Sequence, residues 1–290
     1  MVTDTLAAHG LIANKLIFRL VARVKRLDRS VQAGVYDLPR GASMTELLTR
    51  LASGKTASAR FTAPEGLTLP EIATQAARQL GVPVESVLTA ARDPAEIAAL
   101  GVEARSLEGF LLPETYTLPL GVGARDVVRA MARSFLAAWR PEWDARLDTL
   151  GLTRLQLVTL ASIVEGEARV DEEREVIAGV YHNRLRIGMA LQADPTVQYA
   201  IMLETGNRKP RLFTKDYRFP SPYNTYLYPG LPPGPVNSPG RRSIEASLYP
   251  AKVPFLYFVA MPDGRHRFSA TYNEHLRNVA ESRRAFRGAN

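Results

Sequence analysis

The sequence contains no cysteine, and this absence removes several kinds of site at once. Without cysteine the chain has no disulfide, no Cys-ligated zinc and no iron–sulfur cluster. The four histidines lack the spacing of a metal site, and no His-Glu-x-x-His motif occurs. We therefore expect neither a metal nor a cofactor.

Lysine is also scarce: the sequence has 31 arginines but only six lysines. Its formal net charge is +8. A basic surface favours nucleic acid, anionic membranes or an anionic polymer. The basic residues are scattered, and no nucleic-acid-binding motif occurs, so nucleic acid is not an expected partner. Arginine-rich genome composition explains the charge equally well.

Long hydrophobic runs are missing as well. The most apolar early segment, residues 11–27, is interrupted by five basic residues and is too polar to span a membrane. Its apolar positions recur at helical spacing, which predicts an amphipathic helix. No signal-peptide pattern occurs.

The 290 residues suffice for one large domain or two modest ones. In residues 1–60, short amphipathic helices begin at polar caps such as Ser43, and residues 33–38 (AGVYDL) alternate like a strand. A second capping box, at Thr68 and Glu71, starts a helix in residues 61–106. We expect a small N-terminal module over 1–60, a connecting α/β segment over 61–106 and a main domain over 107–290. Within that domain, residues 124–143 are expected to form a helix.

One acidic residue, Glu165, ends a segment that is otherwise apolar in nearly every helical direction. Thr153 and Gln156 form a capping box at the start of this helix. A carboxylate at a helix C-terminus faces the negative end of the dipole, and burial also disfavours its charge. Such a group can give a proton to a leaving group. A glutamate simply exposed at a turn remains the alternative reading of this position.

Residues 217–240 hold seven prolines and five aromatic residues. A loop of this length inside a compact domain is usually functional or disordered, and the prolines favour an ordered loop. Tyrosine rings pack on the apolar faces of sugars, and amide or hydroxyl groups bond to sugar substituents. The loop is therefore a candidate sugar-binding segment, with a proline-rich site for a partner protein as the alternative. Its candidate contacts are Tyr223, Asn224, Thr225 and Tyr226.

Several long motifs resemble those of one known family, the YceG-like endolytic murein transglycosylases. They are EGFLLPETY (108–116), SIVEGEA (162–168), VIAGVYHNRLRIGMALQADPTVQYA (176–200), SPYNTYLYPGLPPGPVNSPGRRSIEASLYPA (221–251) and LYFVA (256–260). The resemblance covers about residues 33–278. It implies an α+β fold with a LysM-like module over 1–60 and a transglycosylase-type catalytic domain over 107–290.

The resemblance also implies roles for single residues. Glu165 falls on the catalytic acid of the family. Glu114, where aspartate is more usual, approaches the cleft or serves packing. The segment that lines the cleft near the acid contributes Gln192, Asp194 and Thr196.

The implied reaction is non-hydrolytic cleavage of the β-1,4 bond between MurNAc and GlcNAc in peptidoglycan, which leaves 1,6-anhydroMurNAc ends and terminates strand elongation. Classical glycosidases need two carboxylates. Only Glu165 stands out here, which fits a lytic mechanism in which the substrate's own C6 hydroxyl attacks C1. The resemblance further implies peptidoglycan synthases as partners. It implies a single-pass anchor in the bacterial inner membrane that precedes this sequence, with the catalytic part outside the cytoplasm.

Two other functions stay open. A non-catalytic glycan-binding scaffold would use the tyrosine-rich loop for binding and Glu165 as a structural residue. A pyridoxal-phosphate-dependent aminodeoxychorismate lyase would need a Schiff-base lysine. None of the six lysines lies in the apolar segment around Glu165, so the second alternative is the weaker one.

Overall fold

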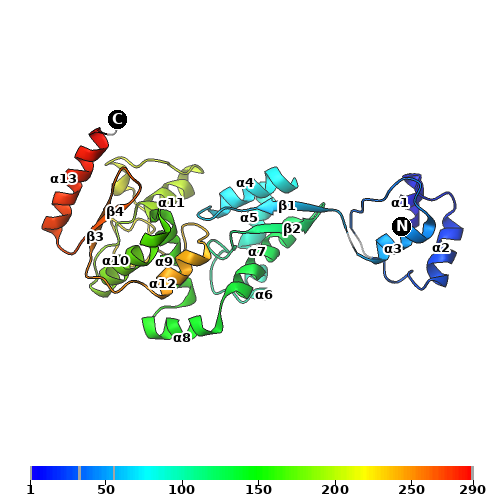
Figure 1. Ribbon diagram of the computed structural model, residues 1–290, viewed down its shortest axis with the longest axis horizontal. Coiled ribbons are helices and arrows are strands. Elements are labelled where there is room, and N and C mark those ends of the chain that lie inside the picture. The colour runs from blue at the N-terminus through cyan, green and yellow to red at the C-terminus, as the bar shows by residue number, and fades with distance from the viewer. Residues whose placement is uncertain (1, 32–33, 55, 289–290) are drawn as a thin grey trace.

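The structure, a computed structural model, describes residues 2–31, 34–54 and 56–288. Figure 1 shows an elongated molecule with a small N-terminal module at one end and the C-terminal helix at the other. The described residues form three hydrophobic clusters, one in the N-terminal module and two that both draw on residues 157–164 and 244–248. Helices are combined with two small antiparallel sheets, so the expected α+β class is confirmed.

The N-terminal module contains α1 (Val2–Ala8), α2 (Lys15–Val24) and α3 (Met44–Ala52) around its own apolar cluster. The strand expected over residues 33–38 is wrong for residues 34–38, and Ala33 lies outside the described residues. The N–H of Ala57 bonds to the carbonyl of Val35 at 2.7 Å, while Tyr36 and Leu38 pack on the helical cluster instead of continuing a ladder. The LysM-like arrangement is therefore not confirmed.

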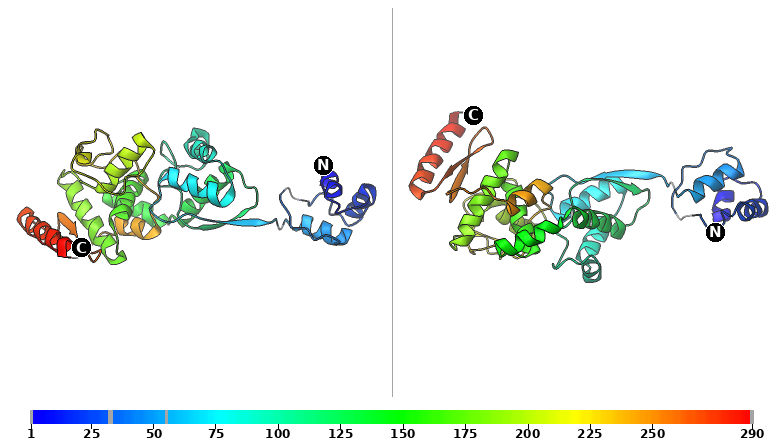
Figure 2. Two further views of the ribbon diagram at one scale, coloured as in Figure 1. Left: turned by 90° about the horizontal axis from the view of Figure 1, so that it is seen from above. Right: turned by 60° about the horizontal axis from the view of Figure 1, so that its bottom comes forward.

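A two-stranded sheet joins this module to the rest of the chain. Strands β1 (Ser58–Thr62) and β2 (Thr115–Pro119) are antiparallel, with Phe61 opposite Tyr116 and their rings stacked. Figures 1 and 2 show β1 as the narrow connection that leaves the module.

The middle of the molecule is helical and packs against this sheet. Its helices are α4 (Leu69–Leu80), α5 (Val84–Arg92), α6 (Pro94–Ala99), α7 (Ala124–Ala138) and α8 (Pro141–Leu150). Apolar residues from 61–106 and from 107–152 share one cluster. The single helix expected over 124–143 is wrong: α7 stops before Pro141 because a residue that precedes proline avoids the helical conformation.

The C-terminal part is built around α9 (Arg154–Glu167). Residues 157–164 of α9 are all buried, and the Thr153–Gln156 capping box forms as expected. The helices α10 (Arg174–Arg186), α11 (Asp194–Thr205) and α12 (Arg241–Leu248) pack on it. The C-terminal end of α9 is thereby surrounded by three other helices.

A short hairpin and a helix complete the chain: β3 (Tyr257–Ala260), β4 (His266–Ser269) and α13 (Tyr272–Gly288). Glu173, in the 3-10 turn before α10, accepts a bond from the backbone N–H of His266 at 2.9 Å and lies 2.7 Å from its Nδ1. This contact fixes the hairpin to the start of α10.

No single helix in the described part of the chain is long and apolar enough to cross a membrane. Only α8 and α9 together meet the length and composition needed, and an 88° bend separates them. The amphipathic helix expected near the N-terminus is α2, which buries Phe18 and Ala22.

Candidate active site

The carboxylate of Glu165 lies in the last turn of α9, and only 7% of its side chain is exposed. Three donors hold it. The Nη1 of Arg174 lies 3.2 Å from Oε1, while the N–H of Gly240 and the hydroxyl of Ser243 donate to Oε2 at 3.0 and 2.8 Å. These donors come from α10 and from the start of α12, so tertiary packing brings them to the end of α9.

The Arg174 guanidinium is itself fixed. Its Nε donates to Oδ1 of Asp171 at 3.1 Å, and its Nη1 donates to the Ser243 hydroxyl at 2.6 Å. Asp171 also pairs with Arg242. Because these neighbours orient Arg174, the Glu165 carboxylate is held in one position, as a catalytic group requires.

Two glycines allow other segments to reach this carboxylate. A Cβ on Gly166 would lie 2.6 Å from Cγ of Pro195, so α11 packs directly on the end of α9. A Cβ on Gly240 would overlap the carboxylate of Glu65. A larger residue at position 166 would push α11 away from α9, and one at position 240 would displace the Glu65 side chain.

Glu65 is a site residue that the sequence analysis missed. It lies in the loop between β1 and α4, and both sides of this loop are tied down. The N–H of Ala63 donates to the carbonyl of Glu114 at 3.0 Å, and the N–H of Gly66 donates to that of Ser238 at 2.9 Å. The loop therefore presents Glu65 in a defined place.

Glu65 lies close enough to Glu165 to be affected by its charge. Burial, and then the neighbouring Glu165 carboxylate, raise the pKa of Glu65 above its ordinary value, and Arg174 and Arg242 partly oppose this. The sequence held one signal for Glu65. It is the Pro-Glu-Gly turn between a strand and a capped helix, where Gly66 adopts φ +74°.

Glu167 and Asp194 form a second acidic pair at the same end of α9. Burial, together with the charge of Asp194, raises the pKa of Glu167 to about 7, and the Tyr181 hydroxyl donates to it at 3.2 Å. Asp194 accepts a bond from the Tyr226 hydroxyl at 2.7 Å. Glu165 and Glu167 thus have different partners, as their two-residue spacing predicts.

Three of the expected substrate-binding residues are buried within the chain: Thr196, Asn224 and Thr225. The Asn224 amide donates to the carbonyls of Tyr217 and Phe219 at 3.1 and 2.9 Å. The hydroxyls of Thr196 and Thr225 share a bond of 2.9 Å. These groups brace the proline-rich loop, and their contact with a sugar stays a prediction.

The remaining expected residues are more accessible. Gln192 is exposed and has a left-handed backbone, with φ +49°. Tyr223 and Tyr226 are half-buried, and Glu114 is exposed at the edge of β2. Glu114 approaches the site through its backbone, because its carbonyl is bonded next to the Glu65 loop. Substrate contact by these four side chains also stays a prediction.

Tyr223 lines a cavity of about 730 Å³ together with Glu108. Glu108 is buried, and its carboxylate accepts bonds from the Leu69 N–H at 3.0 Å and the Tyr199 hydroxyl at 3.1 Å. Burial raises the pKa of Glu108 to about 7. Leu69 is the first residue of α4. Because Glu108 accepts the Leu69 N–H, its carboxylate caps the start of that helix.

The described residues include no group of three or more His, Asp or Glu side chains arranged to hold a metal ion. Lys209, one of the possible Schiff-base lysines, is paired with Asp216 at 2.7 Å. Lys55 lies outside the described residues. The polar groups that contact the Glu165 carboxylate belong to an arginine, a serine and a backbone N–H.

Comparisons with known proteins identify relatives of the whole chain. The chain is 32% identical over 293 residues to a Bacillus subtilis protein named endolytic murein transglycosylase, covering 94% of this chain and 79% of that protein. It is 33% identical to a protein of the same name from Streptococcus pneumoniae, covering 96% of this chain but only 55% of that protein.

A crystal structure of a YceG-like protein from Listeria monocytogenes has the same fold, with a TM-score of 0.67 and 32% identity over 95% of this chain and 94% of that one. The model of the YceG-like family matches residues 1–281. The resemblance drawn from the sequence motifs is therefore confirmed, and the chain belongs to the YceG-like family.

Proposed function

We propose that this protein is a lytic transglycosylase that cleaves the glycan strands of peptidoglycan. The observation that carries the proposal is the Glu165 carboxylate, held by three donors at the end of a buried helix. The family relatives with the name endolytic murein transglycosylase support the same class of substrate.

The proposed reaction breaks the β-1,4 bond between C1 of MurNAc and O4 of GlcNAc. In its simplest form Glu165 protonates O4, the C6 hydroxyl of MurNAc attacks C1, and Glu165 accepts the hydroxyl proton. The product has a 1,6-anhydroMurNAc end, and water is not consumed. Two proton transfers of this kind are the usual work of a positioned carboxyl group.

Digestion of purified peptidoglycan tests the proposal. We expect soluble fragments whose ends are lighter by one water than hydrolysed ends, measured by mass spectrometry. Glu165→Gln should abolish their release, while Glu85→Gln, an exposed change on α5, should not. Bound glycan without cleavage would instead support the scaffold, and absorbance of a bound pyridoxal group would support the lyase.

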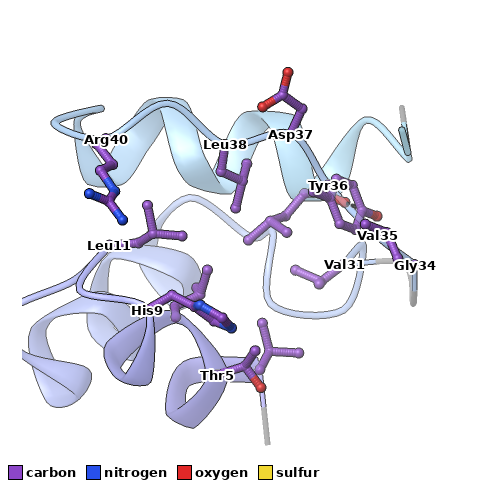
Figure 3. Close-up of a pocket in the computed structure, with 13 residues that line it drawn as sticks. Thr5, His9, Leu11, Val31, Gly34, Val35, Tyr36, Asp37, Leu38 and Arg40 are labelled. Carbon is purple, nitrogen blue, oxygen red and sulfur yellow. Dashed lines mark hydrogen bonds between the residues drawn. The ribbon is translucent and has the colours of Figure 1, made fainter. Parts of the chain in front are cut away.

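We also propose that residues 1–60 contact glycan as a LysM-like module rather than act only as a spacer. A cavity of about 620 Å³ supports this, lined by α1, by Val31 and by residues of the segment 34–40. Figure 3 shows His9, Leu11 and Leu38 on opposite sides of it, with Arg40 nearby. Leu38→Asp should then weaken glycan binding. Binding is measured on purified protein that also carries Glu165→Gln, so that no glycan is cleaved. Unchanged binding would support the spacer.

The proposed substrate lies outside the cytoplasmic membrane, so we propose that the catalytic part works there, beside peptidoglycan synthases whose strands it terminates. Loss of the protein should then lengthen glycan strands in the parent bacterium. Chromatography of released strands measures this, and an unchanged length distribution would contradict the role in termination.

A further inference from the structure

We propose that Glu65 is a second catalytic carboxyl group, which donates the proton to O4 of the leaving sugar while Glu165 takes the proton from the C6 hydroxyl. The inference rests on the lytic reaction proposed above and divides its two proton transfers between two residues. Glu65 and Glu165 are 100 positions apart in the sequence and meet in the fold at Gly240.

Gly240 contacts both carboxylates. Its N–H donates to Oε2 of Glu165 at 3.0 Å, and its α-carbon faces Glu65 so closely that a Cβ would overlap the carboxylate. Gly66, the next residue after Glu65, faces Glu165 as well, since a Cβ there would lie 3.7 Å from its Cγ. Two independent approaches thus place the Glu65 loop over Glu165.

The Glu65 loop is rigid at this point. Gly66 donates to the Ser238 carbonyl, Ser238 donates back to the Leu67 carbonyl at 2.8 Å, and Arg208 donates to the Gly66 carbonyl at 3.1 Å. The segment before α12 and the segment before α4 are therefore fastened to each other. A side chain on such a support can be held at a reacting atom.

The two carboxyl groups have opposite surroundings. Glu165 accepts bonds from three donors, one of them a guanidinium. Glu65 makes no hydrogen bond or ion pair with any other described residue, and the charged groups that act on it are Glu165, Arg174 and Arg242. The first two causes acting on Glu65, burial and Glu165, raise its pKa.

Carboxyl groups whose surroundings differ in this way divide acid and base roles in other enzymes. Glu65 is also the more accessible member of the pair: it is only partly desolvated and much of it stays exposed, whereas Glu165 is almost covered. A structural glutamate in this loop would be expected to bond to a partner, which Glu65 does not do within the described chain.

The proposed step moves two protons and exchanges one C–O bond for another. The Glu65 proton passes to O4, the C1–O4 bond breaks, and GlcNAc leaves as an alcohol. The C6 oxygen forms a bond to C1, and its proton passes to Glu165. The cycle ends with Glu65 ionised and Glu165 protonated, and exchange with solvent restores both.

Leaving-group chemistry separates the two roles. The full-length Glu65→Gln, Glu65→Asp and Glu165→Gln variants are compared on peptidoglycan and on a short glycan that carries 4-nitrophenol on its terminal MurNAc. Nitrophenolate leaves without a proton. We expect Glu65→Gln to lose about 10²–10⁴-fold on peptidoglycan, the usual range for a general acid, and less than about tenfold on the nitrophenyl substrate. Glu165→Gln should lose activity on both.

Glu65→Asp keeps a proton donor and should recover part of the rate on peptidoglycan. A wild-type rate for Glu65→Gln on peptidoglycan, or equal losses on the two substrates, would overturn the assignment of Glu65. Failure of the unmodified protein to cleave either substrate would instead overturn the proposed function. Glu85→Gln serves as the matched control, with unchanged rates on both substrates.

Discussion

Gly240 donates its backbone N–H to the Glu165 carboxylate at 3.0 Å across 75 positions of sequence. The same glycine leaves room for the Glu65 carboxylate on its other side. One residue without a side chain thus separates two acidic groups and contacts both, which makes it the most informative single position in the site.

Gly240→Ala should displace Glu65 without unfolding the protein. The backbone of Gly240 has φ −71°, which alanine adopts freely, and the overlap is with the end of a flexible side chain. We expect the rate on peptidoglycan to fall by about tenfold or more, because small misplacements of catalytic groups are costly. The melting temperature should stay within a few degrees. An equal rate loss from Gly240→Ala in a Glu65→Ala background would show that the effect does not pass through Glu65.

Glu165→Gln should lower turnover by roughly two to four orders of magnitude. The structure also predicts some loss of stability, because Arg174 loses a charged partner in a nearly buried position. The sequence alone favoured unchanged or improved folding, since the change removes a carboxyl that burial destabilises. Thermal melts beside rate measurements decide this, and a higher melting temperature would show that the donors do not offset the burial of the charge.

Stability should fall as the pH rises from about 5 to 8. The folded-state pKa values of Glu108 and Glu167 are about 7, above the ordinary 4.5. The folded protein therefore holds more protons than the unfolded chain in this window, and raising the pH favours unfolding. Melting temperatures of the wild type and Glu108→Gln at both pH values measure this. The melting temperature of Glu108→Gln should change less with pH than that of the wild type. An equal change in the two proteins would show that Glu108 is not a source of the pH dependence.

Asn224 and Tyr223 should respond differently to truncation. Asn224→Ala removes three bonds that hold the proline-rich loop, and lost buried bonds cost about 1–3 kcal/mol each. Its melting temperature should drop by several degrees. Tyr223→Ala opens the wall of a cavity and should weaken glycan binding more than it lowers melting. Melting temperature and glycan affinity are measured for both variants. An unchanged glycan affinity of Tyr223→Ala would exclude Tyr223 from the sugar site.

Local pattern predicted the parts of the site that are local. The apolar run, the capping box at Thr153 and the terminal Glu165 specify one buried helix with an acid at its end, and that helix forms as α9. The proline-rich loop was also recognisable, since its prolines favour an ordered segment.

The donors on Glu165, and the Glu65 carboxyl beside it, depend on contacts between distant segments. No periodicity in residues 58–66 indicates that their loop will meet the start of α12. The expected strand at 34–38 failed for a related reason, because alternation shows that a segment can pair and leaves open whether a neighbouring strand exists. Similarly, the composition of the loop could not show that Asn224 points inward.

The length of β1 bears on where a glycan strand would be cut. It leaves the N-terminal module and ends three residues before Glu65, with β2 bonded along its length. An extended strand advances about 3.3 Å per residue, so β1 sets a fixed distance between Ser58, on the module side, and the loop that carries Glu65. A glycan strand gripped by the module would reach Glu65 after a fixed number of sugar rings. The length of β1 would then work as a ruler for where the polymer is cut.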